Sequence, residues 1–204
     1  TQVKIGIPEN PLEGDIVINE VLFNPYSGGV DFVELYNNSS KIIDLQQLSL
    51  ANRNTTTLEL KEVVSASDTS KLLFPEEFAV ITVNPQLIQQ FYYCQNPSAF
   101  VHVASMPSYS NDLGYVVLLS DSVVIDEMQY SESMHSKIIN DPKGVSLERI
   151  NPNMQSSSQS SWQSASQNVG FATPTYKNSQ YSDLEDKTED FTLSTDIISP
   201  DGDG

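Results

Sequence analysis

Two glutamates are the residues of this chain whose type and position most suggest chemistry, because each interrupts an apolar stretch. Glu20 lies in IVINEVLF (16–23) and Glu34 lies in DFVELY (31–36). Two carboxylates held close together can act as a general acid and a general base. The preferred interpretation is structural: both face solvent or pair with a cation such as Arg149. Three further acids are expected to be strand-end and surface residues, namely Asp31, Asp126 and Glu127.

The last residues carry a motif of the kind that binds calcium. Asp201 and Asp203 alternate with glycines in DGDG. Calcium takes six to eight oxygen ligands, and alternate carboxylates around a glycine turn can supply some of them. Because no further ligand follows Asp203, a complete site is not expected here. We predict no cofactor, with calcium at these two aspartates as the one candidate.

The histidines and the cysteine lack the spacing of a zinc site. His102 alternates with valines in FVHVA and is expected on a strand face, and His135 lies in a polar loop, SESMHSK. Cys94 permits no internal disulfide and is expected to be a small buried residue near a helix. The sequence also contains no G-x-S-x-G nucleophile elbow and no nucleotide-binding glycine pattern. An enzyme is therefore not predicted.

The nine tyrosines are the remaining candidates for a functional surface. Exposed aromatic rings can form a platform for a sugar or for a protein surface. Tyr26 and Tyr109 lie in predicted loops, where recognition residues concentrate. They are the predicted ligand-binding residues, and most of the other tyrosines are expected in the core.

The secondary structure predicted around these candidate residues consists mainly of short strands. Stretches of β-branched and aromatic residues between turn residues predict strands at 16–23, 31–36, 42–50, 78–83, 115–119, 123–128 and 145–150. Ser120-Asp121-Ser122 predicts a hairpin turn. Asn84 as N-cap and Pro85 at the first helical position predict one short helix. Trp162, in a serine-rich stretch, is expected to be anchored in the core. Together these features predict an all-β sandwich or barrel with one or two short helices in its connections.

The charge of the chain excludes some partners. The sequence has 10 Lys plus Arg against 27 Asp plus Glu, a formal net charge of −17, and residues 72–136 contain no Lys or Arg. A DNA or RNA binder needs a basic face. No apolar run approaches the roughly 20 residues of a membrane span, and no basic amphipathic helix is present for anionic lipid. We therefore predict neither a nucleic-acid partner nor membrane insertion.

Seven sequence blocks carry a family resemblance. They are INEVLFNP (18–25), DFVELYNNS (31–39), IDL (43–45), YVVLLSDSVVIDEMQY (115–130), GVSLERINP (144–152), Trp162 and GFATPTYKN (170–178). In this order they resemble the lamin-tail domain. The resemblance implies an immunoglobulin-like β-sandwich over residues 15–178 and a non-catalytic interaction module. Thr175 departs from the family pattern, which usually has Gly there. The DNA contacts of animal lamin tails are not expected here, because the basic surface is absent.

The two ends of the chain are expected to lie outside this domain. Residues 1–14 are interpreted as an N-terminal linker, and residues 179–204 as an acidic linker that leads into a following module. Residues 183–204 carry eight acids and one Lys. IISPDGDG (197–204) also resembles the first strand of an immunoglobulin-like module found at the C-termini of bacterial exported proteins.

The predicted function follows from the resemblance to bacterial members of the family, which occur as modules of large exported proteins. It implies a non-catalytic interaction or structural module of a multidomain bacterial cell-surface or secreted protein, used for adhesion, docking or spacing. Expected partners are a protein or glycan at the cell surface and the neighbouring domains of the parent chain. A carbohydrate-binding accessory module is the alternative, and a hydrolase that uses Glu20 and Glu34 is the third possibility.

Overall fold

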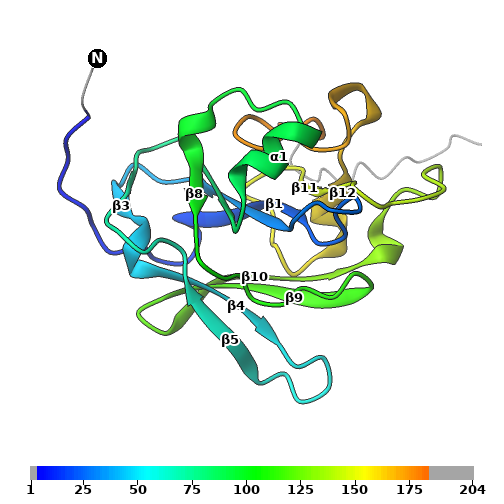
Figure 1. Ribbon diagram of the computed structural model, residues 1–204. Coiled ribbons are helices and arrows are strands. Elements are labelled where there is room, and N and C mark those ends of the chain that lie inside the picture. The colour runs from blue at the N-terminus through cyan, green and yellow to red at the C-terminus, as the bar shows by residue number, and fades with distance from the viewer. Residues whose placement is uncertain (1–3, 184–204) are drawn as a thin grey trace, which may run out of the picture.

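Two packed β-sheets form the structure of this chain, a computed structural model that describes residues 4–183 (Figure 1). The six-stranded sheet contains, in spatial order, β12 (Trp162–Ser164), β11 (Leu147–Arg149), β1 (Ile16–Leu22), β2 (Phe32–Asn37), β7 (Phe78–Thr82) and β8 (Phe100–His102). The four-stranded sheet contains β10 (Val123–Ser131), β9 (Leu113–Ser120), β4 (Leu48–Arg53) and β5 (Leu60–Ser65). A small third sheet pairs β3 (Ile43–Asp44) with β6 (Leu72–Leu73). The predicted all-β sandwich is confirmed.

Among the described residues, helices lie in the connections between strands and, in one case, after the last strand, β12. The single α-helix of the described residues is α1 (Pro85–Phe91). Asn84 caps it, since its side chain accepts a hydrogen bond from the backbone N–H of Leu87 at 3.2 Å, and Pro85 occupies the first turn, as predicted. Short 3-10 helices lie at Leu45–Gln47, Pro97–Ala99, Glu132–Met134, Gln159–Ser161 and Gln167–Val169.

The predicted hairpin joins β9 to β10. Asp121 and Ser122 form its turn, and both have positive φ angles, 47° and 67°. Two consecutive residues of this kind match the right-handed twist of the flanking strands. The hairpin therefore pairs the two longest strands of the four-stranded sheet, with one register shift between Val124 and Asp126.

The main core fills the space between the two sheets. It contains inward-facing residues of both sheets, among them Ile18, Val33, Leu35, Ile81, Leu50, Val116, Leu118 and Met128. Trp162 is buried in the same cluster, and its indole N–H donates to the backbone carbonyl of Ser156 at 2.9 Å. The expected anchoring of Trp162 in the core is confirmed.

The outer face of the six-stranded sheet is also covered. Helix α1 and the C-terminal segment 171–182, which we call the strap, lie on the side of this sheet away from the four-stranded sheet (Figure 1). A second apolar cluster forms beneath them, from Leu22, Phe32, Val80, Ile88, Tyr92, Phe100 and Ala172. A sheet covered on both faces buries polar strand residues as well as apolar ones, and this determines the environment of the glutamates.

Candidate functional site

Three glutamates form a row across neighbouring strands of the six-stranded sheet. Glu20 in β1 is the direct cross-strand partner of Glu34 in β2 and of Glu148 in β11. All three side chains have 0% exposure. The interpretation that Glu20 and Glu34 face solvent or pair with Arg149 is wrong, because the strap covers the face that carries them.

The strap supplies hydrogen-bond donors to every member of this glutamate row. The backbone N–H of Thr173 donates to Glu20 at 2.8 Å, that of Gln180 donates to Glu148 at 2.8 Å, and that of Thr175 donates to Glu34. Side chains add further donors, from Ser146 to Glu20, from Asn19 to Glu34, and from Ser179 to Glu148. Such donors satisfy carboxyl oxygens that would otherwise be buried without partners.

Burial without a cation favours the neutral form of Glu20 and Glu34. Desolvation, and then repulsion by Glu148, raise the pKa of Glu20 to about 8. Desolvation, and then repulsion by Glu20, raise the pKa of Glu34 well above its ordinary value. The Thr173 hydroxyl lies 3.2 Å from Glu20 and 2.7 Å from Glu148. Because this hydroxyl has one proton to donate, it can donate to Glu148 and accept the proton of a neutral Glu20.

Paired carboxyls with raised pKa values also occur in acid–base catalysis. Here, however, the oxygens of Glu20 and Glu34 already accept hydrogen bonds from the strap and from neighbouring side chains, and no surface of either residue is open. The arrangement therefore suits attachment of the strap to the sheet rather than contact with a substrate.

Arg149 pairs with a different acid. Its Nη1 lies 2.8 Å from Asp126 Oδ2, and the two side chains are 4% and 8% exposed. Asp126 Oδ2 also accepts the backbone N–H of Ile18 at 2.7 Å. The pair therefore connects β1 and β11 of one sheet to β10 of the other. The expectation that Asp126 is a surface acid is wrong.

The other two acids named from the sequence differ in burial. Asp31 precedes β2, as expected of a strand-end residue, but it is half-buried rather than fully at the surface, and this burial raises its pKa to about 7. Glu127 lies at the edge of the four-stranded sheet, half-buried, where Arg53 Nη2 contacts it at 2.6 Å. Neither residue belongs to the glutamate row.

The two tyrosines predicted to bind a ligand differ in burial, and ligand binding at Tyr26 stays a prediction. Tyr109 is 6% exposed, packs against Tyr130, and has a hydroxyl without a hydrogen-bond partner among the described residues. The expectation that it is an exposed loop tyrosine is wrong, because its loop folds inward onto the core. Tyr26 is half-buried, with its ring 5.5 Å from that of Phe91 and 6.1 Å from that of Tyr92.

The histidines and the cysteine have separate environments. His102 is exposed at the end of β8, which agrees with the strand position expected of it. His135 is buried rather than placed in an open polar loop; burial lowers its pKa to about 4, and its Nδ1 lies 3.0 Å from Ser164 Oγ. Cys94 is half-buried after α1, and burial raises its pKa to about 11, so the thiol stays protonated at neutral pH.

No metal centre is found in residues 4–183, where no group of three or more His, Cys, Asp or Glu side chains is arranged to hold an ion. Asp201 and Asp203, the predicted calcium ligands, lie outside the described residues. Calcium at these two positions stays a prediction.

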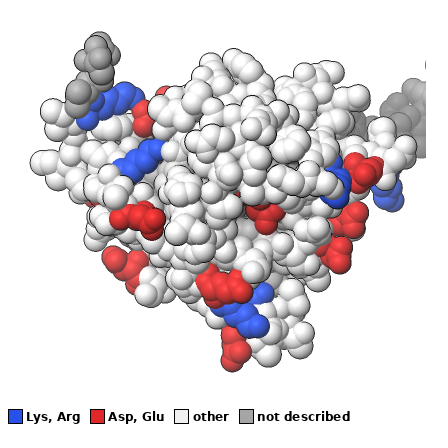
Figure 2. All heavy atoms as spheres, in the orientation of Figure 1, with Lys and Arg blue, Asp and Glu red and all other residues white. Residues whose placement is uncertain are grey.

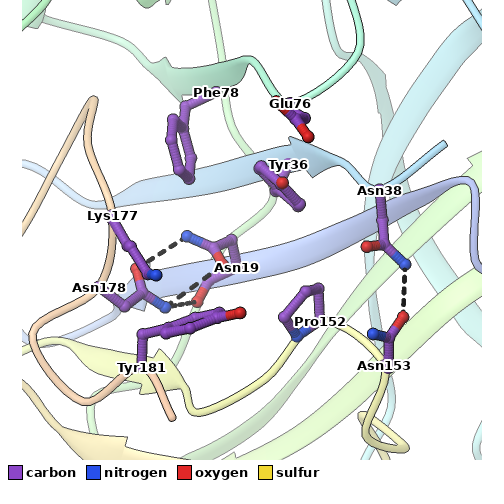
Figure 3. Close-up of a pocket in the computed structure, with 10 residues that line it drawn as sticks. All are labelled: Asn19, Tyr36, Asn38, Glu76, Phe78, Pro152, Asn153, Lys177, Asn178 and Tyr181. Atoms are coloured by element: carbon purple, nitrogen blue, oxygen red, sulfur yellow. Dashed lines mark hydrogen bonds between the residues drawn. The ribbon is translucent and has the colours of Figure 1, made fainter. Parts of the chain in front are cut away.

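An open pocket lies beside the glutamate row, on the same outer face of the six-stranded sheet (Figure 3). It has a volume of about 350 Å³, and ten residues line it: Asn19, Tyr36, Asn38, Glu76, Phe78, Pro152, Asn153, Lys177, Asn178 and Tyr181. Tyr36 of β2 and Phe78 of β7 are cross-strand partners with ring centres 5.0 Å apart. Figure 3 shows these two rings on one side of the pocket and Tyr181 of the strap on the other.

Amide side chains form the floor and rim of this pocket. Asn19 Nδ2 donates to Asn178 Oδ1 at 2.8 Å on the floor, and Asn38 Nδ2 donates to Asn153 Oδ1 at 3.0 Å on the rim. The ammonium of Lys177 lies 3.3 Å from the centre of the Tyr181 ring. The residues around the pocket come from distant parts of the sequence, so no local motif could have identified it.

The comparisons with known proteins identify a family. Residues 9–132 match the Lamin Tail Domain family. No curated protein matches the chain. The match covers strands β1 to β10, whereas β11, β12 and the strap follow it. Members of this family are generally non-catalytic immunoglobulin-like modules, which suggests an interaction role.

The matched range is more than half of the 204 residues, and the ordered blocks that suggested the resemblance include β1, β2 and the β9–β10 hairpin within it. The fold agrees with the family, since strands form two packed sheets with one α-helix among the described residues. The chain belongs to the lamin tail domain family, with an immunoglobulin-like β-sandwich as its fold.

Proposed function

We propose that this chain is a non-catalytic recognition module of a multidomain bacterial protein that is secreted or displayed at the cell surface. One observation carries the proposal: the three glutamates of the row are sealed under the strap, whereas the adjacent pocket is open. An open pocket next to a rigid, hydrogen-bonded sheet is suited to docking. In this role, residues 1–14 and the residues that follow the strap connect the module to neighbouring domains. The predicted linker 179–204 begins too early, because Ser179 and Gln180 of the strap hydrogen-bond to Glu148.

Surface labelling and activity measurements test this proposal together. An antibody against the chain should label intact cells, or detect the protein in the medium, without permeabilisation. Labelling that requires permeabilisation would contradict an extracellular role. A panel of glycoside, ester and peptide substrates should give no turnover. Hydrolysis that disappears in both Glu20→Gln and Glu34→Gln would instead establish the hydrolase.

The surface charge leads to a separate prediction about nucleic acid. In Figure 2, the Lys and Arg side chains on the face shown are scattered among acidic ones and form no continuous patch. Non-specific DNA binding depends on clustered cations that release counterions. We therefore expect no saturable change in the fluorescence anisotropy of a short duplex DNA with up to about 100 µM protein at physiological salt. Binding that weakens steeply with added salt would overturn this expectation.

Membrane insertion is likewise not part of the proposal. Among the helices of residues 4–183, none is both long enough and apolar enough to cross a bilayer. The proposed partners are a protein or a glycan at the cell surface. The residues that line the pocket favour one of these two partner classes.

A further inference from the structure

We infer that the pocket between the strap and strands β2 and β7 binds a saccharide of little or no net charge. This inference rests on the proposed function, since it assigns a ligand class to the recognition module. The volume of the pocket, about 350 Å³, lies at the small end of the range of about 300–1,000 Å³ for ligand pockets. A site of this size admits one sugar ring with its substituents rather than a folded polypeptide.

The aromatic side chains provide the apolar surfaces that such a ligand needs. Tyr36, Phe78 and Tyr181 are all half-buried, so each ring keeps part of its surface open toward the pocket. A sugar ring presents axial C–H groups on its faces and hydroxyls around its edge. Rings on two opposite sides, as in Figure 3, can contact these C–H faces while the hydroxyls remain free to hydrogen-bond.

The polar side chains match the edge of a sugar. A hydroxyl both donates and accepts hydrogen bonds, and a carboxamide offers both functions in one plane. The hydrogen bond between Asn38 and Asn153 uses Nδ2 of the first and Oδ1 of the second. Asn38 Oδ1 and Asn153 Nδ2 have no hydrogen-bond partner among the described residues, so an acceptor and a donor remain available at the rim.

The charges of the pocket balance. Lys177 and Glu76 are its two charged lining residues, with opposite signs, and both are exposed. The Lys177 ammonium lies over the Tyr181 ring, where the electron-rich ring face attracts it. The whole chain carries a formal charge of −17, which disfavours an anion further. A neutral polyhydroxylated ligand fits these charges better than a phosphate or a carboxylate does.

The neighbouring surface allows a ligand longer than one sugar. A second hollow of about 380 Å³ shares Asn38, Pro152 and Asn153 with the pocket. Beyond this shared rim it is lined by polar residues that include Gln155, Ser156 and Ser157. An oligosaccharide of two or more units can therefore cross the rim and contact both hollows.

Glycan-array screening of the full chain, followed by calorimetric titration with the neutral saccharides that bind, tests this inference. We expect saturable binding, and shifts of the side-chain amide NMR signals of Asn38 and Asn153. Tyr181→Ala and Asn153→Ala should each weaken binding about tenfold or more, which corresponds to about 1.4 kcal/mol or more. Tyr93→Ala is the matched control, because Tyr93 is 68% exposed and outside the pocket lining, and it should leave affinity unchanged.

Several outcomes would overturn the inference. They are no saturable binding of any neutral saccharide up to about 10 mM, tight binding of anionic glycans alone, or affinity that Tyr181→Ala and Asn153→Ala leave unchanged. Circular dichroism of each variant shows whether it is folded. A chain found outside the cell that binds no saccharide would overturn this inference but not the proposed function. A chain that is found only inside the cell but binds a neutral saccharide would overturn the proposed function and leave this inference standing.

Discussion

Replacing Arg149 by methionine is expected to lower the free energy of unfolding by about 3–5 kcal/mol. The substitution leaves Asp126 in the interior with its cation removed, and a buried charge without its partner is strongly unfavourable. It also removes the guanidinium from beside the Trp162 ring, whose centre is 5.8 Å away. Urea denaturation followed by tryptophan fluorescence measures the loss.

Arg53→Met is the matched control for this substitution. Arg53 pairs with Glu127 at 2.6 Å, but the two side chains are 20% and 29% exposed. Ion pairs that remain in contact with water contribute about 1 kcal/mol or less. Equally small losses in the free energy of unfolding of both variants would show that the Arg149–Asp126 pair does not stabilise the packing of the two sheets. The double variant Arg149→Met with Asp126→Leu should recover part of the lost stability, because it leaves no unpaired charge.

The second large effect concerns pH: the folded state should become more stable as the pH falls from 8 to 6.5. The pKa of Glu20 is about 8 in the folded chain, above its ordinary value of 4.5. A group with a raised folded pKa binds its proton more tightly when folded. Its stabilising contribution is therefore fully present below pH 4.5 and is lost as the pH rises to about 8. Asp31, with a pKa of about 7, acts in the same direction.

The size of this effect follows from linkage, since each unit of pKa difference corresponds to about 1.4 kcal/mol. Over the window from pH 8 to 6.5, Glu20 is expected to contribute about 2 kcal/mol. Below pH 6.5, His135 opposes the trend, because its folded pKa of about 4 lies below the ordinary 6.5. Denaturation curves at pH 8, 7.25 and 6.5 therefore isolate the carboxyls.

Glu20→Gln identifies the group responsible. The amide has the shape of the carboxyl but does not titrate, so the variant should show a flatter pH dependence than the parent and equal or greater stability at pH 8. Glu132→Gln is the control, because Glu132 is exposed and outside the row. A parent protein whose stability is constant or falls between pH 8 and 6.5 would contradict the raised pKa of Glu20.

Local signals in the sequence were sufficient for most of the fold. The Asn84-Pro85 pair fixes the start of α1, and the turn at Asp121 and Ser122 fixes the longest hairpin, since both depend on neighbouring residues alone. Strand β5 (Leu60–Ser65) was not predicted, because as an exposed edge strand it lacks a buried alternating face. The end of α1 at Phe91 also depends on distant residues: the Tyr92 hydroxyl bonds the carbonyl of Gly144 at 2.8 Å.

The environment of the candidate site could not be predicted in the same way. Glu20 and Glu34 were recognised as unusual, but their burial depends on backbone donors from the strap, some 140 residues or more along the chain. A register shift between Ile18 and Glu20 also breaks the simple alternation of β1, all of whose residues are buried. The pocket was missed because Tyr36, Phe78 and Tyr181 meet only after the strap has folded onto the sheet.

Thr175 illustrates how the structure accommodates a departure from the family pattern. It has a φ of 79°, in the region that favours glycine, where the resemblance leads one to expect Gly. Its N–H donates to Glu34, and its hydroxyl accepts the backbone N–H of Asn96 at 2.9 Å. These hydrogen bonds help to offset the unfavourable backbone conformation, and the hydroxyl adds a contact that glycine could not make.

The position of the strap in the chain has a consequence for the protein during its synthesis. Within residues 4–183, the strap is the last segment to leave the ribosome, so the row of three glutamates meets water while the sheets assemble. Exposed carboxyls are ionised at neutral pH. In the folded domain, burial raises the pKa of Glu20 to about 8, so folding takes up hydrogen ions from solution. Completion of the domain is therefore a proton-coupled reaction, whose rate and extent depend on the pH of the compartment in which it occurs.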